Sequence, residues 1–206
     1  MYNQSVDTEN LPPSQKGRQY EIRGRGLREF AGLRGDTDML DPFDLARYAK
    51  LMVVPFDQLE NLLSAETVEH LLGEGKNAWS GGACSQPLPN GWRLIILNPT
   101  HSAKRHKATL MEEISHVFLG HKPSRLEIKN VNAAGKTIAR DYQADVEEEA
   151  YSVGAAALVP YAGLKKLIGQ GKSSPEIARH FRVSRELVEF RMKVTKLWEL
   201  YKAAQS

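Results

Sequence analysis

The stretch TLMEEISHVFLGH, residues 109–121, decides how the rest of the chain is interpreted. At 100° per residue, one face of a helix formed here would carry four apolar side chains, Leu110, Ile114, Val117 and Phe118. Glu112, Glu113 and His116 fall within an arc of about 100° on the other side. Two carboxylates and an imidazole opposite an apolar face predict a metal site on this helix.

The spacing of these residues is close to that of zinc proteases. In the sequence His-Glu-x-x-His both histidines bind zinc and the glutamate acts as general base. Here Glu112 takes the first position, Glu113 the general-base position and His116 the second ligand position. Paired glutamates and one histidine are also common on solvated helix faces, so the spacing alone leaves that interpretation open.

Composition limits the class of protein. With 206 residues, of which 41% are hydrophobic, we expect one domain and a small appendage. The single cysteine, Cys84, excludes an intramolecular disulfide, fits a reducing compartment and is expected to pack in a sheet. Without a membrane-length apolar run or an apolar signal core, the chain is expected to be cytoplasmic and to have no membrane partner.

The first half of the chain alternates short helices and strands. Residues 1–19 are polar, contain a Pro-Pro pair and are expected to be disordered. Helices are expected over 22–33, from Asp41-Pro42 onward and over parts of 58–72. Strands are expected over 51–56, 78–84 and 92–98, the last two antiparallel around the hairpin signal Asn90-Gly91. His101 and His106 are expected on the surface.

A second strong helix is predicted over residues 141–158, after a loop or weak edge strand at 124–138. Glu147 borders its stripe of small apolar residues, whereas Glu148 points about 100° away. A glutamate at a packed interface needs a partner, and a cation would supply one. A solvated acidic run is the alternative.

The C-terminal segment is basic and helical. From Lys165 onward it has ten Lys/Arg against four Asp/Glu, a charge of +6. Ser and Pro at 173–175 and Ser184 predict two capped helices joined by a turn, the helix-turn-helix pattern. Five side chains would then face phosphates: Arg182, Arg185, Arg191, Lys193 and Lys196. A small helical cap packed on the rest of the protein is the alternative.

Taken together, the order and spacing of these pieces over residues 41–200 resemble the ImmA/IrrE family of small metallo-endopeptidases. The resemblance includes the Asp-Pro-Phe-x-Leu-Ala helix, the EExxH helix, the Glu-x-Glu-Ala segment ending in Leu-Val-Pro, and the Ile-Ala-x-x-Phe-x-Val-Ser tail. It implies that Glu112 and His116 are metal ligands and that Glu113 is the base. The third ligand implied is Glu147, with Glu149 as the alternative; Glu147 is preferred because it borders the packed stripe.

The glutamate at position 112 changes the expected metal chemistry. Two carboxylates and one imidazole form a harder and more anionic set than two imidazoles and a carboxylate. We expect one divalent metal, zinc first, with manganese or iron favoured by the harder set. His121 could enter the site if the helix unwinds at Gly120.

These observations predict an α+β fold: a small mixed or antiparallel sheet packed on helices, with a metalloprotease-type active-site helix and a helix-turn-helix-like C-terminal tail. The expected regions are a disordered segment (1–19), a metallopeptidase-like domain (20–162) and the tail (163–206). The resemblance implies a metal-dependent endopeptidase that cleaves a regulatory protein such as a transcriptional repressor. The alternative is a catalytically inactive, protease-like regulator that binds DNA or a repressor through its C-terminal helices.

Overall fold

The computed structural model describes residues 8–60, 63–83, 87–121 and 141–205, which form two compact units. The central unit comprises residues 42–151, and the flanking unit combines the chain up to Asp41 with the chain from Ser152. The predictions for Cys84 and for residues 124–138 concern residues outside this description. No described helix has both the length and the apolar composition of a membrane span.

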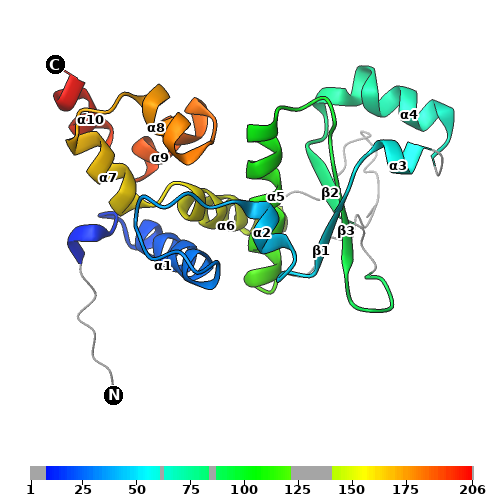
Figure 1. Cartoon of the computed structure of the whole chain (residues 1–206), viewed down its shortest axis with the longest axis horizontal. Coiled ribbons are helices and arrows are strands. Elements are labelled where there is room, and N and C mark those ends of the chain that lie inside the picture. The colour runs from blue at the N-terminus through cyan, green and yellow to red at the C-terminus, as the bar shows by residue number, and fades with distance from the viewer. Residues whose placement is uncertain (1–7, 61–62, 84–86, 122–140, 206) are drawn as a thin grey trace. The chain divides into compact units, whose positions relative to one another are not determined.

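A three-stranded mixed sheet forms the framework of the central unit (Figure 1). Its strands are β1 (Leu51–Val54), β2 (Gly81–Ala83) and β3 (Arg93–Leu97), in the order β1-β3-β2. β1 is parallel to β3 and β2 is antiparallel to it, so the predicted antiparallel pair is confirmed. The predicted turn is present as well: Gly91 has φ +80° and donates its N–H to the Leu88 carbonyl.

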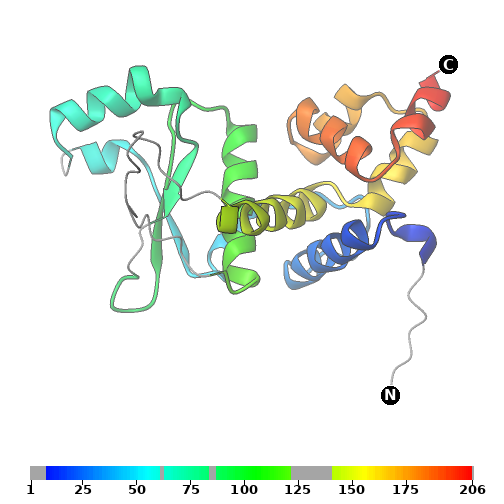
Figure 2. The same ribbon diagram turned by 180° about the vertical axis from the view of Figure 1, so that it is seen from behind.

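Helices surround this sheet. They are α2 (Pro42–Ala46), α3 (Asp57–Glu60), α4 (Ala65–Leu72) and α5 (Ala103–Phe118), with a 3₁₀ turn at Glu74–Asn77. Figures 1 and 2 show α5 running alongside the strands, with α3 and α4 at one end of the sheet. The α+β fold with a small mixed sheet is therefore confirmed.

The apolar face of α5 differs in part from the prediction. Leu110, Met111 and Ile114 are fully buried, whereas Val117 and Phe118 are 37% and 41% exposed. Val117 and Phe118 lie two turns beyond Leu110 and Met111 on the same stripe. The last turn of α5 is therefore less covered than the middle of the helix, although the periodicity placed all four apolar side chains on one face.

The flanking unit is helical. It contains a 3₁₀ turn (Thr8–Asn10), α1 (Gln15–Phe30), the end of α6 (Asp141–Leu158), α7 (Tyr161–Gly169), α8 (Ser174–Phe181), α9 (Arg185–Val194) and α10 (Trp198–Gln205). α1 lies against the end of α6, because a Cβ added at Gly24 would be 2.8 Å from the Ala156 Cβ (Figure 2).

The expectation that residues 1–19 are disordered is wrong for the part that the structure describes. α1 begins at Gln15, where the Ser14 side chain accepts the N–H of Gly17 as an N-cap. Leu11, just before the cap, is buried. The polar composition of residues 1–19 did not indicate the capped helix that begins at Gln15, which is stabilised by contacts with residues far along the chain.

A buried ion pair links the two parts of the flanking unit. Arg191 of α9 donates to the carboxylate of Glu21 in α1, and only 3% of Arg191 is exposed. The Arg191 Nε also donates to the Val159 carbonyl at 2.9 Å, and Glu21 accepts the N–H of Tyr161. Both charges are thus satisfied inside the protein, and the predicted phosphate contact by Arg191 is wrong.

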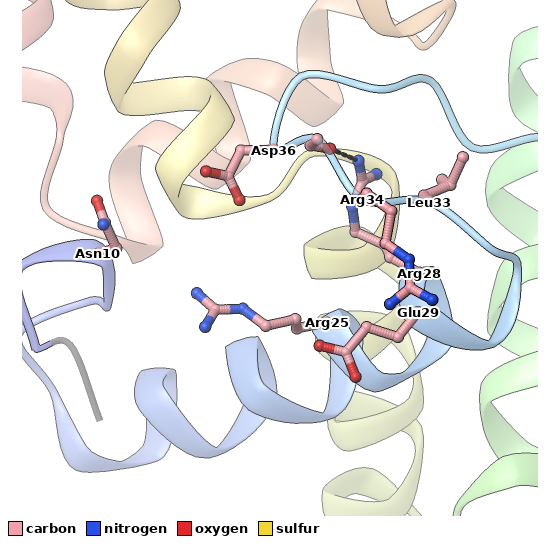
Figure 3. A pocket seen from close by; sticks show the side chains of 8 residues that line it. Asn10, Arg25, Arg28, Glu29, Leu33, Arg34 and Asp36 are labelled. Carbon is pink, nitrogen blue, oxygen red and sulfur yellow. Dashed lines mark hydrogen bonds between the residues drawn. The ribbon is translucent and has the colours of Figure 1, made fainter. Parts of the chain in front are cut away.

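A second arginine satisfies backbone carbonyls at the end of α6. Arg28 donates to the carbonyls of Ala157, Gly35 and Asp38 at 2.9, 3.0 and 2.6 Å. Figure 3 shows it beside a pocket of about 250 Å³ whose walls have mixed charge. The lining residues are Asn10, Arg25, Arg28, Glu29, Leu33, Arg34, Gly35 and Asp36. Arg28 is thus held by the fold and fixes the loop that follows α1.

The division into units differs from the predicted regions. The flanking unit takes in residues 20–41 and 152–162, which the sequence placed with the metallopeptidase-like domain. α1 belongs to the flanking unit because it contacts the chain from residue 156 onward. The sequence could not predict this, because local patterns do not show pairs as distant as Glu21 and Arg191.

Replacing Arg191 tests the buried ion pair. Arg191→Ala should lower the free energy of unfolding by about 3–5 kcal/mol, because it leaves the Glu21 carboxylate buried without its counter-ion. Urea denaturation followed by circular dichroism measures the change. The double variant Glu21→Gln/Arg191→Met, which removes both charges, should be less destabilised. Arg185→Ala is the control, and an equal loss in that exposed variant would contradict the assignment.

Candidate metal centre

The site is built on α5, whose two ends are defined by their caps. At the start, the Ser102 side chain accepts the N–H of Arg105. At the end, Gly120 adopts φ +69°, a left-handed conformation that glycine tolerates. The His121 N–H donates to the His116 carbonyl at 2.9 Å, which closes a Schellman turn. The turn directs the chain back, so that His121 lies beside the last turn of α5.

The three predicted ligands come together in the central unit. Glu112 and His116 of α5 and Glu147 of α6 each offer a donor atom, and these atoms lie within 4.8 Å of one another. The His116 Nε2 is 3.3 Å from a Glu147 carboxylate oxygen. Nitrogen and carboxylate oxygen donors suit a first-row divalent cation, and a cation would offset the repulsion between the two glutamates. The residues present therefore fit a metal ion.

The geometry also bears on the choice between Glu147 and Glu149. The Glu149 carboxylate lies 3.1 Å from the His121 Nε2 and is not a member of the three-donor cluster. Glu147 reaches His116 directly. Glu147 is thus the third ligand that the geometry favours.

Proximity of the carboxylates changes their acidity. The pKa of Glu112 is raised to about 7, first by burial and then by the charges of Glu147 and Glu113. Burial also raises the pKa of Glu113, an effect opposed by His116 and reinforced by Glu147. A raised pKa makes Glu113 a better proton acceptor near neutral pH than an ordinary glutamate.

Two further residues surround the cluster. Tyr151 follows Glu147 by one turn of α6, and its pKa is raised by burial and then by the charge of Glu112. From the sequence, no role at the site was predicted for Tyr151. His121 reaches the site without any unwinding of α5: its Nδ1 lies 3.0 Å from the Nδ1 of His116. It therefore contacts the side of His116 that faces away from Glu147.

The two histidines that precede the 109–121 stretch, His101 and His106, lie outside the cluster. His106 interacts through Nε2 with the Asn98 carbonyl at 2.7 Å, and neither ring nitrogen of His101 has a hydrogen-bond partner among the residues that the structure describes. His106 also borders an apolar recess of about 550 Å³ in the central unit. The recess is lined by Phe43, Val53, Val54, Pro55, Phe56, Asp57, Leu97, Pro99 and His106.

In the flanking unit, the two other arginines predicted to contact DNA are exposed. Arg182 lies in the turn between α8 and α9 with φ +54°, and Arg185 opens α9. Arg185 donates to Glu189 at 2.6 Å. Ser184 caps α9 by accepting the N–H of Leu187. Of the three predicted arginines, the structure thus exposes Arg182 and Arg185 and buries Arg191.

Comparison with known families agrees with the geometry of the site. A family model described as the IrrE N-terminal-like domain, Peptidase_M78, matches residues 76–193. The chain belongs to this peptidase M78 family. The match to the M78 family includes α5 and the whole of α6, and with them all three candidate ligands. No curated protein and no solved structure gives a significant match.

The acidity of Glu112 predicts a pH dependence of stability. In the metal-free protein the folded state holds the Glu112 proton more tightly than the unfolded chain, in which a glutamate has its ordinary pKa of about 4.5. The free energy of unfolding should therefore fall as pH rises from about 4.5 to about 7, by on the order of 2–3 kcal/mol from this residue. Urea denaturation at a series of pH values measures this.

Glu112→Gln should remove most of that decline. Glu66→Gln, a change at an exposed position of α4, is the matched control and should keep the wild-type profile. Parallel profiles for the wild type and Glu112→Gln would show that Glu112 ionises without penalty.

Proposed function

We propose that this M78 family protein is a metal-dependent endopeptidase that cleaves a regulatory protein, such as a transcriptional repressor, in the cytoplasm. The observation that carries the proposal is the donor cluster of Glu112, His116 and Glu147, with Glu113 adjacent on α5. These residues hold one divalent metal: zinc first, with manganese or iron as alternatives. Membership of the M78 family supports a protein substrate. The resemblance of the sequence to ImmA/IrrE proteins supports a regulatory protein as that substrate.

The roles of the side chains follow from their positions. When bound, a divalent metal would supply a Lewis acid that polarises the scissile carbonyl and acidifies water. Glu113, which is outside the donor cluster, accepts the proton of the attacking water and passes it to the leaving amine. His116, Glu112 and Glu147 keep the donor atoms in place. Tyr151 lies one turn of α6 beyond Glu147, and its pKa is raised by burial and then by the charge of Glu112.

The donor atoms of this site affect which metal ion binds. A Glu/His/Glu set carries two negative charges, one more than a His/His/Glu set. The extra charge reduces the Lewis acidity that remains for substrate, and hard oxygen donors improve the competition of manganese and iron with zinc. Measured metal content of protein purified without chelators or metal-affinity resin should therefore be near one ion per chain.

The apolar recess supports a protein substrate. It lies in the same unit as the donor cluster, and His106 of α5 borders it. Its apolar lining suits an apolar side chain of a bound peptide.

Glu113→Gln separates catalysis from metal binding. The amide keeps the shape of the side chain and removes the base, so peptide cleavage should fall about 10²–10⁴-fold while metal content stays near one per chain. His116→Ala and Glu147→Ala should lose both. Cleavage of a candidate repressor and elemental analysis measure the two properties.

The outcomes of this experiment are distinct. Equal target-gene output from wild type and Glu113→Gln, with no cleavage product from either, would refute the peptidase. Purified protein that contains no metal and takes up no zinc, manganese or iron would refute the metal site.

The second candidate is a catalytically inactive regulator that binds DNA or a repressor through its C-terminal helices. Two observations favour it: a glutamate occupies the first ligand position, and α8, a short turn and α9 place Arg182 and Arg185 on the surface. This arrangement is typical of a helix-turn-helix, in which residues at the start of the second helix reach the major groove.

DNA binding predicts a dependence on salt. If Arg182 and Arg185 contact phosphates, each alanine variant should weaken binding and flatten the plot of log affinity against log salt by about one unit. Fluorescence anisotropy with a labelled duplex at several salt concentrations measures both effects. Lys104→Ala, an exposed change on α5, is the control. Absence of binding at low salt would refute the DNA-binding candidate.

A further inference from the structure

We propose that His121 and Glu149 are positioning residues that hold the imidazole of His116 with its Nε2 lone pair directed at the metal. The proposal rests on the metal site of the proposed function and adds two residues to it. Its basis is a chain of contacts that runs from the carboxylate of Glu149 through His121 to His116.

The contacts in this chain are close and lie within the central unit. The His121 Nε2 is 3.1 Å from a Glu149 carboxylate oxygen, and the His121 Nδ1 is 3.0 Å from the His116 Nδ1. The two imidazole rings meet edge to face, with centroids 5.1 Å apart. On its far side, the His116 Nε2 faces Glu147 at 3.3 Å. One nitrogen of His116 therefore faces the donor cluster and the other faces His121.

The chemistry of the carboxylate sets the direction of these hydrogen bonds. An ionised Glu149 can only accept, so His121 donates its Nε2–H to it. A neutral His121 then carries a lone pair on Nδ1, and it accepts the Nδ1–H of His116. With its proton on Nδ1, the neutral His116 has its lone pair on Nε2, the nitrogen that belongs to the donor cluster.

Backbone geometry places His121 for this task. The Schellman turn at Gly120 joins the His121 N–H to the carbonyl of His116 itself. The same pair of residues is thus connected twice, through the main chain and through the side chains. His121 is largely buried, with 11% of its side chain exposed, which limits competition by water for these hydrogen bonds.

A partner that orients a ligating histidine has a measurable effect on the metal. Removal of such a partner typically costs 10–100-fold in metal affinity. His121→Phe keeps a ring of similar size and removes both nitrogens, so it should weaken zinc binding by about that factor. His121→Asn restores an acceptor oxygen at the place of Nδ1 and should recover most of the loss. His70→Phe, at an exposed position of α4, is the matched control and should bind zinc as the wild type does.

The test combines two measurements. Competition with a chromophoric chelator gives the zinc dissociation constant of each variant, and thermal unfolding of the metal-free proteins shows whether each variant is folded. Long-range ¹H–¹⁵N NMR of the zinc-loaded wild type, at a pH of about 8 where ordinary imidazoles are neutral, identifies which nitrogens carry protons. The zinc-loaded form is used because, without a cation, the ionised Glu147 carboxylate 3.3 Å away would itself accept an Nε2–H from His116. Protons on the His116 Nδ1 and the His121 Nε2 are expected.

Each outcome is decisive. A proton on the His121 Nδ1 that is donated to His116 would overturn the proposal, as would an unchanged zinc affinity in folded His121→Phe. Equal losses in His121→Asn and His121→Phe would also overturn it, because they would show that ring packing is what matters. If the wild type binds no zinc, the proposed function fails, and the same NMR measurement on metal-free Glu147→Ala, in which the Glu147 carboxylate no longer faces the His116 Nε2, decides the hydrogen-bond order independently.

Discussion

Mutual repulsion of three carboxylates is the constraint around which the central unit is arranged. Glu112 and Glu113 are partly buried on one turn of α5, and Glu147 of α6 adds its charge to both. His116 lies within their reach, with its Nε2 3.3 Å from a Glu147 carboxylate oxygen. Such a cluster is costly unless a proton or a metal ion offsets its charge. The raised pKa of Glu112 shows the first solution, and the ring of donor atoms provides for the second.

Under this constraint the side chains of the site have different roles. The glutamates of the donor set provide charge, whereas His116 provides direction, because an imidazole offers one lone pair in its plane. A carboxylate can rotate and still coordinate, but an imidazole with its proton on the wrong nitrogen cannot. The support behind His116, from His121 and Glu149, is therefore placed where a loss of orientation would cost most.

Local patterns predicted which side chains would cluster, and they did not predict the long-range packing. The spacing on α5 brought Glu112 and His116 together at one turn, and the border position of Glu147 favoured the glutamate of α6 that joins their donor cluster. The partner of Arg191 could not be predicted, because Glu21 lies 170 residues away and nothing in the basic pattern of α9 separates a buried arginine from an exposed one. Helical periodicity also could not show that Val117 and Phe118, in the last turn of α5, are partly exposed. The contact of His121 depends on the left-handed turn after the helix, which a helical projection does not include.

The division into two units has a consequence for the order in which the protein assembles. The central unit is continuous in sequence, so it can fold on the ribosome as soon as its last residues emerge. The flanking unit is discontinuous, and α1 must wait for the chain beyond residue 156 and finally for α9. α1 gains its packing surface when the end of α6 emerges, and Glu21 gains its buried counter-ion only when Arg191 follows. During synthesis the nascent chain would therefore hold a folded central unit while α1 is still an exposed helix, the kind of species on which chaperones and proteases act.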